Sequence, residues 1–176
     1  MGINVAPANR RWREQNGVIY FSVESDRATG TEWIERFKRR GLELKGYVRD
    51  VLRSRDFRHA SSEVTNVVVF RRDFFQYNEE HLQEIRALAS ERKLIAPNAE
   101  VACLIREQFS DEEIEEMGLA FVIVMHEPFV DFLGRPNILT VGSRFSTHDS
   151  RLLEAGDYEQ KDLLGVQCGF AFQFPR

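Results

Sequence analysis

Residues that could act as general acids or bases follow the most apolar segment of the chain, residues 119–125. His126 and Glu127 come directly after it, and Asp131 lies four residues further along, on a loop that contains a proline. An imidazole and a carboxylate delivered by a rigid strand could exchange protons with a bound ligand. Adjacent residues of an extended strand point to opposite sides, however, so His126 and Glu127 need not act together.

A second acid–base pair, His148 and Asp149, lies on a later loop. Together with the first group it completes the predicted catalytic set, which consists of His126, Glu127, Asp131 and His148. These groups are also suitable metal ligands, but no HExxH or comparable spacing links them, so neither a metal site nor a cofactor is predicted. The alternative interpretation is that these side chains only make hydrogen bonds in turns and at the surface.

The two cysteines offer no further catalytic signature. Cys103 lies in the apolar stripe of a predicted helix and Cys168 on a phenylalanine-rich predicted strand, so both are interpreted as core residues. They form no CxxC, and they are too few for a disulfide framework, which favours a reducing compartment. The GxSxG, P-loop and GxGxxG patterns of common hydrolases and nucleotide-binding proteins do not occur in the chain.

Charge is distributed unevenly along the chain. Its 24 Lys and Arg against 28 Asp and Glu give a net charge of −4, which argues against a general nucleic-acid-binding surface. Residues 1–58 nevertheless carry 13 basic against 8 acidic residues, whereas residues 59–176 carry 11 against 20. Such runs can be solvated helix faces, or the two regions can face each other within the fold or across a dimer. The predicted anion-binding residues are Arg49, Arg53, Arg55 and Arg58.

Two short amphipathic helices are predicted to carry this basic region. Thr31 is the expected cap of the first helix and Gly41 its end, and the second helix covers residues 45–54. The pair resembles a helix-turn-helix, in which the basic second helix would contact nucleic-acid phosphates. Predicted strands on both sides of the pair, where a helix-turn-helix domain has a third helix, weigh against this interpretation.

The remaining elements must position the candidate acid–base site. Strands are predicted, from β-branched and aromatic content, over residues 17–24, 64–70, 119–125, 138–142 and 166–174. Further helices are predicted over residues 79–93 and 99–108, followed by a short one capped by Ser110 and Glu113. The unbroken apolar run 119–125 indicates a central strand covered on both faces, whereas the alternation in 166–174 indicates one buried side.

This order of elements predicts an α+β fold, with a mixed or antiparallel sheet of about five strands packed with four to five helices. The 176 residues, 43% of them hydrophobic and 30% charged, are enough for one domain with a sizeable core. No repeat or linker divides the chain, so a single domain is predicted over residues 17–176. Residues 1–16 lack apolar periodicity and are predicted to form a flexible N-terminal arm.

The chain is expected to be a cytoplasmic protein without a membrane partner. Its longest apolar run has seven residues, residues 119–125, far short of the roughly 20 that cross a bilayer. The N-terminus also lacks the apolar stretch of a signal peptide, because Trp12 is surrounded by charged residues.

Several segments resemble those of a group of small uncharacterised bacterial proteins that carry similar stretches in the same order. These segments are TGTEWIERFKRRG, PNAEVACLIREQFSDEEIEEMGL and VMHEP, followed by GFAF near the C-terminus. The resemblance covers most of residues 17–174, and residues 144–164 depart from the Gly- and Trp-rich form of the group. It implies a bacterial domain and, because no activity is attached to the group, implies no function.

The leading hypothesis is therefore a small non-enzymatic binding or interaction domain of bacterial origin. It would engage a protein partner, or a second copy of itself, through the basic helix pair or the loops at the end of the sheet. The second hypothesis is a small acid–base or metal-assisted enzyme, in which His126 or Glu127 meets Asp131, His148 or Asp149 in a pocket. Nucleic-acid binding through the basic helix pair is the third.

Overall fold

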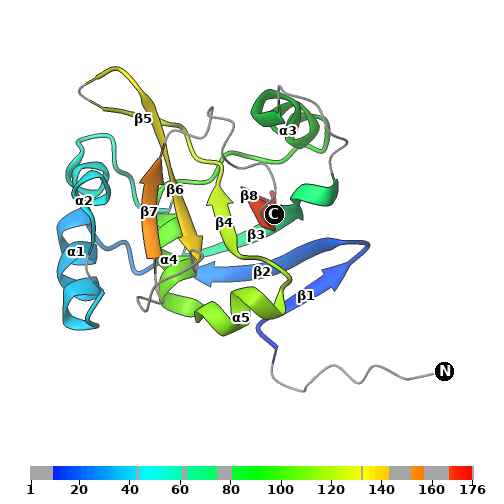
Figure 1. Cartoon of the computed structure of the whole chain (residues 1–176), viewed down its shortest axis with the longest axis horizontal. Coiled ribbons are helices and arrows are strands. Elements are labelled where there is room, and N and C mark those ends of the chain that lie inside the picture. The colour runs from blue at the N-terminus through cyan, green and yellow to red at the C-terminus, as the bar shows by residue number, and fades with distance from the viewer. Residues whose placement is uncertain are drawn as a thin grey trace.

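The computed structural model describes residues 10–42, 44–60, 63–74, 81–131, 133–142, 152–156 and 167–175. These residues form one mixed β-sheet of eight strands with five α-helices packed on it (Figure 1). The predicted α+β class is confirmed, although the sheet has eight strands where the sequence predicted about five. No helix of the described ranges is long and apolar enough to cross a bilayer.

The strands, in chain order, are β1 (Trp12–Gln15), β2 (Val18–Glu24), β3 (Val64–Arg71), β4 (Phe121–Val124), β5 (Phe129–Val130), β6 (Pro136–Gly142), β7 (Leu152–Gly156) and β8 (Cys168–Gln173). The helices are α1 (Gly30–Arg39), α2 (Gly46–Arg53), α3 (His81–Glu91), α4 (Glu100–Gln108) and α5 (Asp111–Glu116). Strands β1, β5 and β7 have no counterpart in the sequence prediction, because each is short and none is uniformly rich in β-branched or aromatic residues.

The sheet order is β1-β2-β3-β8-β4-β6-β5, with β7 also paired to β6. Every neighbouring pair is antiparallel except β4 and β8, which run parallel. The chain thus places its last strand in the middle of the sheet, and β1 lies at one edge.

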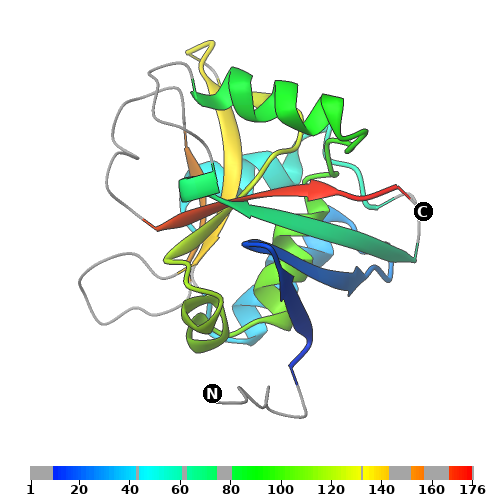
Figure 2. The same cartoon turned by 90° about the vertical axis from the view of Figure 1, so that its right-hand side faces the viewer.

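Helices cover both faces of the sheet (Figure 2). Helix α3 lies on one face, where Ile85 and Ala89 join a hydrophobic cluster with Phe170 and Phe172 of β8. Helices α1, α2, α4 and α5 lie on the other face and form the larger cluster with the alternate residues of the strands. The sheet is therefore buried on both faces, under α3 on one side and under the other four helices on the opposite side.

Strand β4 occupies the central place that its unbroken apolar run predicted. It pairs with β8 on one side and β6 on the other. Val122 and Val124 belong to the larger cluster, whereas Ile123 and Met125 belong to the α3 cluster. The prediction that this segment lies in mid-sheet and is buried on both faces is confirmed.

The prediction that residues 166–174 form a strand with one buried side is wrong, because both faces of β8 are buried. Cys168, Phe170 and Phe172 face the α3 cluster, as their alternation suggested, but Ala171 between them is also fully buried on the opposite face. At Gly169 an added Cβ would lie 2.5 Å from Val69 Cγ1, so the small residue reflects close packing rather than exposure. This second buried face carries the small residues Gly169 and Ala171, so the hydrophobicity pattern alone did not predict its burial.

The predicted N-terminal arm, residues 1–16, is wrong for its last residues, because Trp12–Gln15 forms β1. Asn16 and Gly17 have φ of 53° and 76°, the left-handed values of a type I′ turn, and Gln15 pairs with Val18 across it. Asn-Gly turns of this kind join hairpins whose strands need not be apolar. Residues 1–9 lie outside the described residues.

The helix caps lie where the sequence predicted them, except that the N-terminal cap of α1 lies two residues earlier. The cap of α1 is Thr29, not Thr31: its side chain accepts from the Glu32 N–H, and the Glu32 carboxylate accepts in return from the Thr29 N–H. Gly41 has φ +74°, as a residue ending a helix should. The capping box predicted for Ser110 and Glu113 is confirmed at α5.

Candidate binding groove

His126, the first predicted catalytic residue, is a buried structural link. Its Nδ1 donates to the Glu127 carbonyl oxygen at 2.7 Å, and its Nε2 accepts from the Leu139 N–H of β6 at 2.9 Å. These two bonds define a neutral imidazole with the proton on Nδ1. Burial lowers the pKa of His126 to about 4. With both ring nitrogens held by the main chain, His126 joins the end of β4 to β6.

The other described members of the predicted set lie in different hydrogen-bond environments. The Glu127 side chain is exposed. Asp131 accepts from the main-chain N–H groups of Leu133 and Arg135 and from Arg135 Nε, and these bonds hold its pKa below the usual value. They shape the turn between β5 and β6. His148 and Asp149 lie outside the described residues, and no contact among the described members joins them into an acid–base pair.

The predicted anion-binding arginines are exposed on and after α2. Helix α2 buries its opposite face, including Val48 and Leu52, in the larger cluster. Arg58 turns back to donate to the carbonyl oxygens of Arg55 and Phe57. Within the described part of the chain none of the four forms an ion pair, so they remain available to an anion, and their binding role stays a prediction. These arginines are Arg49, Arg53, Arg55 and Arg58.

Other basic residues of the first third of the chain meet the acidic residues that follow in sequence. Arg36 and Arg40 both pair with Glu107, and Arg36 also pairs with Asp26, which precedes it within its own region. Lys45 pairs with Glu154 of β7 at 2.7 Å. The interpretation that the two oppositely charged regions face each other within the fold is therefore confirmed for these residues.

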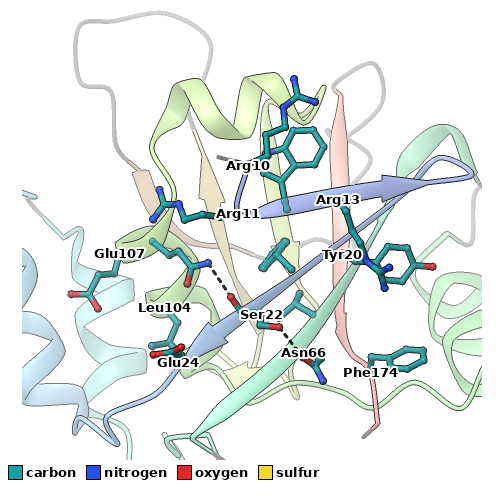
Figure 3. Close-up of a pocket in the computed structure, with 14 residues that line it drawn as sticks. Arg10, Arg11, Arg13, Tyr20, Ser22, Glu24, Asn66, Leu104, Glu107 and Phe174 are labelled. Atoms are coloured by element: carbon teal, nitrogen blue, oxygen red, sulfur yellow. Dashed lines mark hydrogen bonds between the residues drawn. The ribbon is translucent and has the colours of Figure 1, made fainter. Parts of the chain in front are cut away.

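A groove of about 960 Å³ lies beside β1 and β2 (Figure 3), in a place that no sequence prediction singled out. Apolar side chains that line it include Phe21 and Leu104, and Phe174 stands half-exposed at its margin. Its polar lining is arginine-rich near the start of β1 and acidic near the end of β2. The groove therefore combines an apolar wall with charges of both signs.

The groove exists because the chain leaves the sheet at Arg11. The residues of β1 pair with Val18–Phe21 only, and the backbone bends at Arg11. The Arg11 guanidinium donates to both carboxylate oxygens of Glu113, at 2.7 and 2.8 Å, and lies 5.4 Å from the centre of the Phe109 ring. This clamp to α5 draws the chain away from β2, so no described strand lies beside the last residues of β2 on this side.

The main chain of β2 presents hydrogen-bonding groups to the groove. The Ser25 N–H donates to the Glu63 carbonyl, on the β3 side. Because main-chain N–H and C=O groups alternate in direction along a strand, those of Ser22 and Glu24 point away from β3. The Ser22 carbonyl accepts from the side-chain amide of Gln108 at 2.9 Å, drawn as a dashed line in Figure 3. The N–H and C=O of Glu24 have no hydrogen-bond partner among the described residues.

Charge changes sign along the groove. Arg10 lies 4.8 Å above the Trp12 ring and Arg13 lies 5.1 Å above the Tyr20 ring, and neither forms an ion pair with a described residue. At the other end stands Glu24, exposed and likewise without an ion pair in the described ranges. A ligand with a negative end and a positive end would complement this arrangement.

Comparisons with known proteins do not assign the groove a function. No protein-family model matches the chain, and neither a curated protein nor a solved structure is significantly similar to it. The resemblance to a group of small bacterial proteins therefore stays a prediction. Within the residues that the structure describes, no three His, Cys, Asp or Glu side chains gather as they would around a metal ion.

The sequence did not indicate this groove because residues 1–16, which include its arginines, lack apolar periodicity. Asn16-Gly17 was the signal that could have revealed the hairpin, since Asn-Gly is the strongest short-range mark of a type I′ turn. A hairpin there would have placed Arg13 opposite Tyr20, as the pairing shows. Nothing in the sequence indicated that β1 would stop short of the end of β2.

Proposed function

We propose that the protein is a non-enzymatic binding domain whose groove receives an extended peptide with acidic residues. The observation that carries the proposal is the main chain of Glu24, which has no hydrogen-bond partner among the described residues, in a groove that Arg10 and Arg13 also line without an ion pair to a described residue. An open sheet edge binds peptides by adding a strand, with main-chain hydrogen bonds giving affinity and flanking side chains giving selectivity. The arginines supply that selectivity for carboxylates.

Two other occupants suit the groove less well. The edge that a second copy could add is only Ser22–Glu24, because β1 pairs with the residues of β2 before it, and three residues make a small interface. Residues 1–9, which precede Arg10, contain no acidic residue and so lack the groups that the arginines select. An acidic segment of another protein fits the groove better.

Single-stranded nucleic acid is the second class of anionic ligand. Proteins that bind it stack bases on open aromatic faces. In this groove the faces of Trp12 and Tyr20 already carry guanidinium groups, and the chain has a net charge of −4. These features support a peptide over a nucleic acid.

A cytoplasmic location and a bacterial origin belong to the same proposal. The two cysteines, Cys103 and Cys168, are unpaired and buried, which suits a reducing compartment. Burial raises the pKa of the Cys168 thiol to about 11, so it is not a reactive thiolate at neutral pH. The bacterial origin is supported only by the segments that resemble the group of bacterial proteins.

The test is fluorescence polarisation with a labelled acidic peptide of strand-forming sequence, KTVIVDE. We expect saturable binding that is abolished by Glu24→Pro, because proline removes the outward N–H and blocks strand addition without touching the β3 side. Glu24→Gln is the matched control, since it keeps the main chain, and it should still bind. Equal binding by both variants would show that the peptide does not add to β2.

A charge-matched pair of variants locates the site. Arg10→Glu with Arg13→Glu should weaken binding by about tenfold or more, whereas Arg49→Glu with Arg53→Glu, an equal change of charge on α2, should have little effect. The reverse result would move the anion site to the basic helix that the sequence indicated. Salt-sensitive binding of an oligothymidylate in preference to every peptide would overturn the proposal in favour of nucleic acid.

A further inference from the structure

The ring of His126 takes the place of a main-chain carbonyl in the sheet. Strands β4 and β6 pair Ile123 with Thr140, so the next partner of Leu139 along β4 would be Val124. The Val124 carbonyl oxygen instead accepts from the His126 N–H at 2.8 Å, where the chain turns out of β4. The Leu139 N–H donates to Nε2 of the imidazole at 2.9 Å. A titratable side chain therefore accepts a hydrogen bond that would otherwise belong to the sheet.

This bond attaches the β5–β6 hairpin, which extends beyond the rest of the sheet (Figure 1). Residues 126–128 form a bulge, because they have no counterpart in β6 before the pair of Phe129 with Asn137. Beyond the bulge the turn is held by its own hydrogen bonds, one of them from the Asp131 N–H to the Arg135 carbonyl oxygen at 2.9 Å. The hairpin can therefore keep its internal structure if its attachment to β4 is broken.

Protonation of the imidazole would break that attachment. In the neutral ring Nδ1 donates to the Glu127 carbonyl oxygen, and Nε2 accepts from Leu139. The imidazolium carries a hydrogen on both nitrogens. The new Nε2–H would then face the Leu139 N–H, so two donors would meet with no acceptor between them. Two buried donors without a partner are costly, and the conflict follows from the direction of the two bonds alone.

The surroundings of His126 do not compensate a positive charge. The ring is buried, and strands β4 and β6 contain no charged residue. From α3, Arg86 donates to the His126 carbonyl oxygen at 3.3 Å, and its own positive charge opposes protonation. On the hairpin, Asp131 is bonded to Arg135 and the Glu127 side chain is exposed. Among the described residues no carboxylate therefore stabilises the charged ring.

We propose that protonation of His126 releases the outer part of the β5–β6 hairpin, residues 126–137, from the end of β4 while the rest of the sheet stays folded. The charged ring would leave Leu139 and turn to water. Strand β6 stays paired with β7 from Ile138 onward, so the movement ends there. The hairpin lies at the opposite end of the sheet from β1, and the inference does not rest on the proposed peptide groove.

Release of the hairpin would enlarge the apolar surface of the protein. Val130 and Leu133 are already exposed at its tip. Phe129 is partly buried against the larger cluster, and its ring lies 5.4 Å from that of His126, edge to face. Because Phe129 follows the bulge, it would move out with the histidine. The protein would thus present three neighbouring apolar side chains in acid and two at neutral pH.

The size of the effect follows from the two environments of the ring. Burial lowers the pKa of His126 to about 4 in the closed hairpin, whereas a ring released into water titrates near the ordinary value of 6.5. The open form binds the proton more readily, so the opening equilibrium shifts toward it as the pH falls between these values. From pH 7 to pH 5 the equilibrium constant for opening should rise about twentyfold.

Native-state hydrogen exchange of the full chain, followed by NMR for each amide, tests the inference. The quantity measured is the exchange rate of the Leu139 N–H divided by the rate of an unstructured peptide at the same pH. We expect this ratio to rise about twentyfold from pH 7 to pH 5. We also expect it to be insensitive to urea up to about 1 M, because a local opening exposes little surface. The Val69 N–H of β3 is the reference, and its slower exchange should rise steeply with urea.

A pair of variants assigns the effect to the imidazole. His126→Gln cannot gain a proton, so the rise between pH 7 and pH 5 should shrink to near unity, whereas His59→Gln, at an exposed histidine, should keep it. The inference is wrong if His126→Gln keeps the rise. Two outcomes in the natural chain, which need no variant, also overturn it. One is an exchange ratio of Leu139 that does not change with pH, and the other is exchange as sensitive to urea as that of Val69, which would mean that the hairpin opens only with the whole protein.

Discussion

The side-chain amide of Gln108 donates to the main-chain carbonyl of Ser22 at 2.9 Å, in the position where a neighbouring strand would place its own N–H. Gln108 is the last residue of α4, and Ser22 lies on β2, so a helix end substitutes for a missing strand. A carbonyl satisfied by one mobile side chain is easier to recruit than one locked in a ladder of main-chain bonds. This contact satisfies the outward-facing carbonyl of Ser22 near the end of β2.

Removal of the Gln108 amide should therefore favour the ligand. In Gln108→Ala the Ser22 carbonyl has lost its side-chain donor, so a peptide N–H no longer has to displace the Gln108 amide. We therefore expect KTVIVDE to bind a few-fold more tightly. The free energy of unfolding should fall by only about 1 kcal/mol, the worth of one hydrogen bond at the surface. Polarisation and urea titration measure the two effects. Weaker binding by Gln108→Ala would instead make the amide a direct ligand of the peptide.

Glu100 should be a major contributor to stability. Its carboxylate is fully buried and accepts from the Trp33 indole N–H, the Ser25 hydroxyl and the Ala60 N–H, at 3.1, 2.8 and 2.6 Å. Glu100→Ala leaves three buried donors without a partner and should cost about 3 to 5 kcal/mol. Urea unfolding followed by tryptophan fluorescence measures the loss.

Two matched variants control this experiment. Glu100→Gln keeps the size of the side chain but turns one acceptor oxygen into a donor, so its cost should be clearly smaller than that of Glu100→Ala. Glu115→Ala removes an exposed carboxylate from α5 and should change stability by less than about 0.5 kcal/mol. A loss of under 1 kcal/mol in Glu100→Ala would contradict the role given to the buried carboxylate.

His126 should make the fold sensitive to mild acid. Its pKa is about 4 in the folded state, below the ordinary value of 6.5, so the unfolded chain binds a proton that the folded chain refuses. The stabilisation is complete above pH 6.5 and is lost as the pH falls toward 4. Between pH 7 and pH 5 the loss should amount to about 2 kcal/mol.

The pH dependence can be assigned to His126 by comparing variants at both pH values. His126→Gln should be less stable than the natural chain at pH 7 but should lose much less further stability at pH 5. His59→Gln, which replaces an exposed histidine, should keep the full loss. If His126→Gln retained the same fall in stability, another group would be responsible for it.

Gly30 should not tolerate a methyl group. An added Cβ would lie 1.7 Å from the main-chain oxygen of Leu52, so α1 and α2 would have to move apart. We expect Gly30→Ala to cost about 3 kcal/mol, at the upper end of overpacking effects. Gly46→Ala is the control: it adds the same methyl group at the start of α2, where nothing lies within 4 Å, and it should be neutral or slightly stabilising. Thermal unfolding that ranked the two variants equally would contradict this packing.

The candidate site at His126 shows how far local sequence signals reach. The pattern around residues 119–125 correctly placed β4 in mid-sheet and His126 at its end, because an unbroken apolar run is stable only where both faces are covered. It did not show that the Leu139 N–H would occupy the histidine ring, since β6 pairs with β4 through the fold. The position of His126 at the end of β4 was thus predicted correctly. Its hydrogen bonds to the main chain of Glu127 and Leu139 make it a link between strands.

The sequence by itself determined the helices, the main strands and most of their ends, because β-branched runs, helical periodicity and capping residues act over a few neighbouring positions. Only the tertiary structure decided what those elements expose. Arg11 donates to Glu113 and Gln108 donates to Ser22, contacts between residues far apart in the chain. Together they leave the end of β2 without a strand partner among the described residues. Such contacts depend on how the layers pack, so no local pattern of residues encodes them.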